Sequence, residues 1–81
     1  MEIKQEAIEE IIKRLAGILG KCASEFSEET AFDGLDLKSV NYSQLTTFLE
    51  DRFDVEVPYM SFRRCKTISE AGDYIASLSE A

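Results

Sequence analysis

The most informative segment of the sequence is residues 32–53, FDGLDLKSVNYSQLTTFLEDRF. It begins as a loop with two apolar anchors, Phe32 and Leu35, and continues into a segment with helical periodicity. The apolar positions of that helix, which we expect over residues 40–53, are Val40, Leu45, Leu49 and Phe53. Ser39 stands just before the first of them. We therefore predict that Ser39 is the N-cap, where a side-chain oxygen accepts a hydrogen bond from a free N–H group of the first turn.

The segment before it predicts a long helix followed by a long loop. Residues 2–19 carry apolar side chains at helical spacing and charged ones on the opposite face, and Gly17 or Gly20 is expected to end the helix. Residues 20–38 show no sustained periodicity. Phe26, together with the two anchors named above, indicates a loop held against the helices, with a short helical turn expected around residues 25–29.

The segment after residue 53 predicts a short helix and a final longer one. Pro58 precedes the short helix, expected over residues 59–64 with Met60 and Phe62 as apolar contacts. Thr67 and Glu70 form a capping-box sequence that opens the final helix. Its apolar face contains Ile68, Ala71, Ile75 and Leu78, while Gly72 weakens the helix but allows close packing. The sequence therefore predicts one domain over residues 1–81, an all-α bundle of three main helices and one short helix.

The charge balance restricts the possible partners. The chain has nine basic and sixteen acidic residues, for a net charge of −7. Nucleic-acid binding depends on neutralising phosphates with Lys and Arg, so this balance argues against it and fits better with basic protein partners. No apolar run reaches the length needed to span a membrane, and the charged N-terminal segment does not resemble a signal peptide. We expect a cytoplasmic monomer.

The residue inventory also disfavours an enzyme. The chain has no histidine, which excludes histidine-based catalysis and Cys/His zinc sites. Cys22 and Cys65 form no CxxC pair, and we expect both thiols to be buried or half-buried in a reducing compartment. The segment 33–36, DGLD, lacks the regular oxygen ligands and closing Glu of an EF-hand. We therefore expect no metal site and no catalytic residues.

The joint spacing of several motifs resembles the acyl carrier protein family. The matching elements are Phe32, Leu35 and Ser39, the helix that follows, the segment Phe53 to Pro58 (FDVEVP), Thr67-Ile68 and Tyr74-Ile75. In that family a serine at the start of the central helix carries a 4′-phosphopantetheine arm derived from coenzyme A. The resemblance implies that Ser39 is the attachment residue, that a phosphopantetheinyl transferase modifies it, and that acyl-transferring enzymes act on an acyl chain held as a thioester.

The chain departs from the family pattern next to the serine. The family usually shows Gly-x-Asp-Ser, whereas this chain has Asp36, Leu37 and Lys38 before Ser39. The segment 41–44, NYSQ, also lacks the acidic residues that the family often carries on the exposed face of the helix. The departures indicate a specialised carrier with its own set of partner enzymes. Lys38 is also the feature that favours an alternative, a carrier-like interaction module that is not modified.

The resemblance further implies a docking surface and a cargo. Asp36 and Lys38 would shape recognition beside Ser39, Leu37 and Val40 would belong to the docking surface, and Met60 and Phe62 would lie near the point where the acyl chain enters. Ser43, Thr46 and Thr47 could line the path of a polar acyl group, although we favour a position in solvent. Arg63, Arg64 and Lys66 form a basic patch, which could steer an acidic partner or lipid headgroup, but a solvated charge cluster is the favoured interpretation. We expect a role in fatty-acid, lipid or lipopolysaccharide-type biosynthesis; a carrier for aminoacyl or polyketide intermediates is the other alternative.

Overall fold

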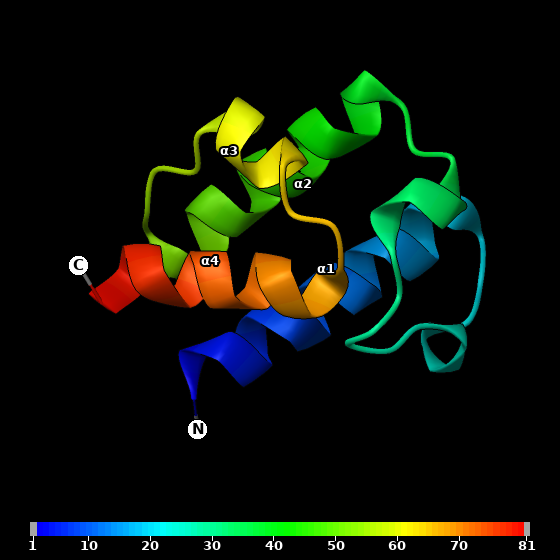
Figure 1. Ribbon diagram of the computed structural model, residues 1–81, viewed down its shortest axis with the longest axis horizontal. Helices are drawn as coiled ribbons and strands as arrows, with labels where there is room; N and C mark the ends of the chain where they lie inside the picture. The colour runs from blue at the N-terminus through cyan, green and yellow to red at the C-terminus, as the bar shows by residue number, and fades with distance from the viewer. Residues whose placement is uncertain (1, 81) are drawn as a thin grey trace.

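The computed structural model describes residues 2–80 as a bundle of four α-helices, in agreement with the all-α prediction (Figure 1). The helices are α1 (Ile3–Leu19), α2 (Ser39–Phe53), α3 (Tyr59–Arg63) and α4 (Ile68–Glu80). Two 3-10 turns, Ala23–Glu25 and Phe32–Leu35, lie in the long connection between α1 and α2. The first lies slightly earlier than the helical turn that we expected around residues 25–29, and the second was not predicted. None of the helices described is long and apolar enough to cross a membrane.

Helices α1 and α4 cross closely and form the base of the bundle (Figure 1). Gly72 of α4 makes this approach possible, because a Cβ atom at this position would lie 2.6 Å from Cγ1 of Ile8 in α1. Lys4 and Asp73 form an ion pair of 3.0 Å at the edge of the same contact. Of the two glycines expected to end α1, Gly20 does so, in the left-handed conformation with φ of 66°.

The long connection is held to the start of α4 by backbone hydrogen bonds. The N–H of Phe32 donates to the carbonyl of Lys66 at 2.9 Å, and the N–H of Ile68 donates to the carbonyl of Thr30 at 3.1 Å. Phe26 and Phe32 are buried and Leu35 is half-buried, as expected for apolar anchors. The connection is therefore an ordered part of the fold, and it fixes the position of the start of α2.

An aromatic cluster fixes α3 against α2 and the connection. The ring centroids of Phe32 and Phe62 lie 6.0 Å apart, those of Phe32 and Tyr42 lie 6.0 Å apart, and those of Tyr42 and Phe62 lie 6.4 Å apart. Phe62 has no exposed surface and Tyr42 is only 6% exposed. Tyr42 is thus a core residue and not part of an exposed helix face, which corrects our interpretation of residues 41–44. The cluster places the short helix α3 beside the first turns of α2.

Candidate functional site

Ser39 is the first residue of α2, and its side chain is exposed to solvent. The N-cap is Lys38, so our assignment of Ser39 as the N-cap was wrong by one residue. The backbone N–H of Lys38 donates to Oδ1 of Asn41 at 3.0 Å, and its carbonyl accepts hydrogen bonds from the N–H groups of Asn41 and Tyr42. Because Asn41 closes this first turn, the hydroxyl of Ser39 is not used as a cap.

The hydroxyl of Ser39 instead belongs to a small polar cluster with α3. Nη1 of Arg63 donates a hydrogen bond to the Tyr59 hydroxyl oxygen at 2.9 Å. The pKa of the Tyr59 hydroxyl is lowered from its ordinary value, first by hydrogen bonding from the nearby Ser39 side chain and then by the hydrogen bond from Arg63. We call Tyr59 and Arg63 the Tyr59–Arg63 pair. It connects the start of α2 to α3 through side chains twenty or more residues away along the chain.

Sequence reasoning missed this role for both residues. Tyr59 was only the first residue of a predicted helix, and Arg63 was one member of a basic patch expected to be solvated. The available signal was their spacing, because residues i and i+4 lie on the same face of a helix. All three basic residues, Arg63, Arg64 and Lys66, are exposed, but Arg63 also contacts Tyr59 and the Tyr42 ring, whose centroid lies 4.3 Å from its guanidinium carbon.

Two apolar side chains near the start of α2 and in α3 face solvent. Val40, directly after Ser39, is 59% exposed, and Met60, directly after Tyr59, is 66% exposed. Leu37 is half-buried, and Asp36 is exposed with a left-handed backbone, φ 54°. Val40 is therefore not a core residue, although its place in the helical pattern had indicated that it was.

The remaining candidates divide between surface and core. Phe62 is fully buried in the core, as expected for an apolar contact of the short helix, whereas Met60 is exposed, and the role of both at an acyl entry stays a prediction. Ser43 and Thr47 are exposed, as favoured, but Thr46 is buried and its hydroxyl donates to the carbonyl of Ser43 at 3.0 Å. The hydroxyl of Thr46 is therefore already paired within the helix. It offers little to a polar acyl group.

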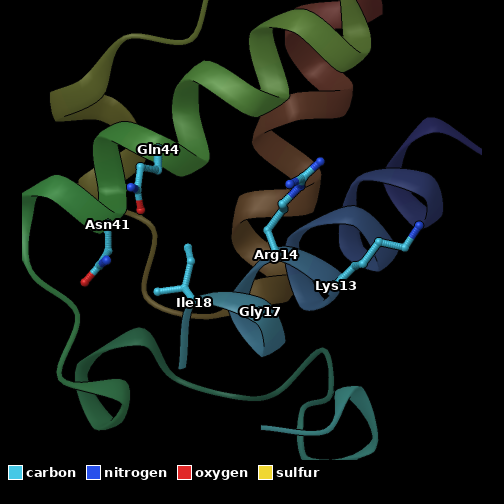
Figure 2. Close-up of a pocket in the computed structure, with 6 residues that line it drawn as sticks. All are labelled: Lys13, Arg14, Gly17, Ile18, Asn41 and Gln44. Atoms are coloured by element: carbon cyan, nitrogen blue, oxygen red, sulfur yellow. The ribbon is translucent and has the colours of Figure 1, made fainter. Parts of the chain in front are cut away.

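A groove lies on the other side of the first turns of α2, between α1 and α2 (Figure 2). It has a volume of about 530 Å³ and is lined by Lys13, Arg14, Gly17, Ile18, Asn41 and Gln44. A neighbouring hollow shares Arg14, Ile18 and Gln44 and continues to Phe48, over whose ring the Arg14 guanidinium lies at 3.5 Å. Four of the six residues that line the groove are polar or charged and only Ile18 has a large apolar side chain, so the groove does not resemble an enclosed apolar acyl-binding cavity.

Positive charge is present at the start of α2, around Ser39. In residues 2–80 no three His, Cys, Asp or Glu side chains come together as a possible metal site. The cations beside the serine are Lys38 and Arg63, and the N-terminus of the 15-residue helix α2 adds partial positive charge. The two cysteines do not add a second candidate site. Cys22 is exposed, contrary to our expectation, and Cys65 is half-buried.

Comparisons with known proteins identify relatives along nearly the whole chain. The phosphopantetheine attachment site family matches residues 8–75. An acyl carrier protein of Acidothermus cellulolyticus is 34% identical over 74 residues, covering 85% of this chain and 88% of that protein. An acyl carrier protein of Streptococcus pneumoniae serotype 4 is 36% identical over 75 residues, covering 93% of this chain and 90% of that protein. The NMR structure of the HMG-ACPI domain from the CurA module of Lyngbya majuscula matches with a TM-score of 0.80 at 25% identity, covering 98% of this chain and 82% of that one.

Proposed function

Because the chain belongs to the acyl carrier protein family, whose members carry covalently attached 4′-phosphopantetheine, we propose that Ser39 is the residue to which this group is attached. The observation that carries the proposal is the position of Ser39, an exposed primary hydroxyl at the first residue of α2. A transferase can reach a hydroxyl at such a junction without unfolding the helix. The hydroxyl is also free of any capping role.

The surroundings of Ser39 fit a phosphodiester. A negative charge at this position meets the N-terminus of α2 and the cationic side chains of Lys38 and Arg63. Arg63 is already hydrogen-bonded to Tyr59, whose hydroxyl is in turn in contact with Ser39. The donor set is therefore suited to an anion on the serine oxygen.

The attachment reaction is a phosphoryl-group transfer from coenzyme A catalysed by a phosphopantetheinyl transferase. The Ser39 Oγ–H bond breaks and a bond from Oγ to phosphorus forms. The pyrophosphate P–O bond of coenzyme A breaks at the same phosphorus, adenosine 3′,5′-bisphosphate leaves, and the serine proton passes to a base of the transferase. The protein itself is a carrier and not an enzyme, and the attached group supplies a thiol that holds acyl chains as thioesters.

We propose that the partner enzymes dock on the surface around Ser39. Val40 and Met60 are exposed apolar side chains suited to the centre of such an interface, and the half-buried Leu37 lies three residues before Val40. Asp36 and Lys38 supply opposite charges before the serine. In this proposal the protein works as a cytoplasmic monomer that meets each partner in turn.

For the pathway, we propose fatty-acid, lipid or lipopolysaccharide-type biosynthesis, supported by relatives that carry the plain name acyl carrier protein. A second candidate is a carrier for polyketide or aminoacyl intermediates. The likeness to a carrier domain of the CurA module favours it. The two candidates share Ser39 and its chemistry and differ in the enzymes that load and extend the chain.

An intact-mass measurement tests the attachment. The native chain, Ser39→Ala and Ser43→Ala are incubated with coenzyme A and a broad-specificity phosphopantetheinyl transferase. Ser43 is a matched control because it is an exposed serine one turn later on the same helix. We expect the native chain and Ser43→Ala to gain one phosphopantetheine and Ser39→Ala to gain none. No gain on the folded native chain with several transferases would instead support the unmodified interaction module.

A loading assay separates the two pathway candidates. The modified protein is charged with a malonyl group and offered to a fatty-acid ketosynthase, with an acyl carrier protein from fatty-acid synthesis as the reference. Chain extension at a comparable rate supports the fatty-acid assignment. Extension of the reference alone supports the second candidate.

A further inference from the structure

We propose that Tyr59 and Arg63 hold the phosphodiester that joins the arm to Ser39, so that the base of the arm is fixed against α3. This inference rests on the proposed attachment at Ser39. It assigns a positioning role to two residues that sequence reasoning did not connect with the serine.

Arg63 is already oriented for such a contact. Nη1 donates to the Tyr59 hydroxyl at 2.9 Å, and the guanidinium carbon lies 4.3 Å from the centroid of the Tyr42 ring. Burial raises the pKa of Tyr42, which keeps this ring neutral beneath the cation. Since Tyr42 packs against Phe32 and Phe62 in the core, the platform under Arg63 is rigid. A guanidinium has five N–H donors, so the bond to Tyr59 leaves others for a phosphate oxygen.

Modification of Ser39 changes the hydrogen bonding of Tyr59 in a defined way. In the unmodified protein the Tyr59 oxygen accepts a hydrogen bond from Arg63, whose guanidinium lies over the ring of Tyr42, three residues after Ser39 on α2, and the lowered pKa of Tyr59 is consistent with a nearby Ser39 hydroxyl. Esterification replaces the serine hydrogen with phosphorus, so Ser39 can no longer donate. The new phosphate oxygens lie two bonds beyond the serine oxygen, on the phosphorus, and the O–H of Tyr59 can then turn and donate to one of them. Tyr59 therefore changes from acceptor to donor, while Arg63 neutralises the single negative charge of the diester.

The neighbouring basic residues do not offer the same contact. Lys38 adds charge on a flexible, exposed stem, and an ammonium at the end of such a stem loses more freedom when it binds. Arg64 is exposed and lines a different hollow, together with Cys65, Asp73 and Tyr74 between α3 and α4. Arg64 directly follows α3 and carries the same charge as Arg63, but its side chain lines a different hollow, so it is a matched control for Arg63.

Phosphorus NMR on the modified protein tests the contact. Native chain, Tyr59→Phe, Arg63→Gln and Arg64→Gln are modified, and intact mass first establishes that each carries one phosphopantetheine. Backbone ¹H–¹⁵N spectra establish that each is folded. We expect the ³¹P resonance of Arg63→Gln and Tyr59→Phe to move toward that of the same chain unfolded in urea, whereas Arg64→Gln keeps the native position. Identical ³¹P positions in all four folded proteins would overturn the proposal.

A titration of Tyr59 supplies an independent readout. Its pKa is followed by ¹³C NMR of the phenol carbon before and after modification, with the signal assigned from Tyr59→Phe. We expect the pKa to rise on modification, because the hydrogen bond from Ser39 is lost and an anion is placed beside the hydroxyl. An unchanged pKa on a chain that has gained the mass of one phosphopantetheine would refute the contact and leave the attachment itself intact. A chain that gains no mass would refute the proposed function instead.

Discussion

Replacing Gly72 with alanine tests how closely α1 and α4 pack. Gly72 lies inside a helix, where glycine costs roughly 1 kcal/mol relative to alanine. Propensity alone therefore predicts that Gly72→Ala stabilises the protein. The structure predicts the opposite, because the new methyl group would lie 2.6 Å from Cγ1 of Ile8, 3.2 Å from its Cδ1 and 3.3 Å from the carbonyl oxygen of Lys4.

The size of the loss in stability depends on which neighbouring atoms can move to relieve the clash with the new methyl group. Ile8 is only 2% exposed and branched at Cβ, and its Cγ1 is not the free end of the side chain. The clash must then be relieved by separating the helices or by forcing Ile8 out of its rotamer. Overpacking of this kind costs about 1–3 kcal/mol. Subtracting the gain of roughly 1 kcal/mol in helix propensity leaves a net loss of about 0–2 kcal/mol, and the approach of 2.6 Å to a buried side chain places Gly72→Ala toward the upper end of this range.

Urea denaturation followed by circular dichroism measures this loss, with Gly17→Ala as the matched control. Gly17 also lies inside a helix, but nothing lies within 4 Å of its would-be Cβ. We expect Gly17→Ala to raise the free energy of unfolding by about 0.5–1 kcal/mol and Gly72→Ala to lower it. In thermal unfolding, each kcal/mol corresponds to about 4–8 °C for a domain of this size.

The decisive result is that the two variants change the free energy of unfolding in opposite directions. If Gly72→Ala were as stabilising as Gly17→Ala, the close approach of α1 and α4 would be refuted. A change in the slope m for Gly72→Ala would indicate an altered native state, so the comparison requires equal slopes.

Three further predictions concern the serine, the last helix and the thiols. Ser39→Ala should change the free energy of unfolding by less than about 0.5 kcal/mol, because Ser39 is exposed and is not the N-cap; a loss above 1 kcal/mol in urea denaturation would contradict this. Thr67→Ala should lose about 1 kcal/mol, since Oγ1 of Thr67 accepts the N–H of Glu70 at 3.2 Å; unchanged stability would contradict the cap. Iodoacetamide at pH 8 should alkylate Cys22 faster than Cys65, because Cys22 is exposed while burial and the Glu70 carboxylate raise the pKa of Cys65; peptide mapping showing the reverse order would be inconsistent with the structure.

The order of the helices could be predicted because the signals are local. Periodic apolar residues, Gly20 after α1 and the pair Thr67 and Glu70 before α4 each act within a few residues. The position of the first helical residue of α2 was less predictable. A serine before an apolar helix is usually its cap, but here the amide of Asn41 closes the turn on Lys38 and moves the boundary by one residue.

Burial on α2 could be predicted only in part, since it depends on which elements cover the helix. Val40 has an apolar side chain at a helical spacing and is 59% exposed, while Tyr42 and Thr46 are each 6% exposed. The aromatic contacts of Tyr42 come from the connection and from α3, both distant in sequence. The Tyr59–Arg63 pair was missed for the same reason, because its approach to Ser39 is a consequence of how α3 packs.

The distribution of charge around Ser39 bears on partner choice more directly than the net charge does. The chain is acidic overall, yet four of its nine basic residues are Lys38, Arg63, Arg64 and Lys66, which directly precede Ser39 or lie in and just after α3. A basic partner that recognises an acidic residue beside the attachment serine would meet Lys38 there instead, and like charges at an interface disfavour binding. Arg63 is exposed, but its guanidinium is already engaged by the Tyr59 hydroxyl and by the Tyr42 ring, so it is less available to such a partner. In the proposed function, Lys38 is therefore the charge that selects among partners, whereas Arg63 serves the proposed phosphodiester on Ser39.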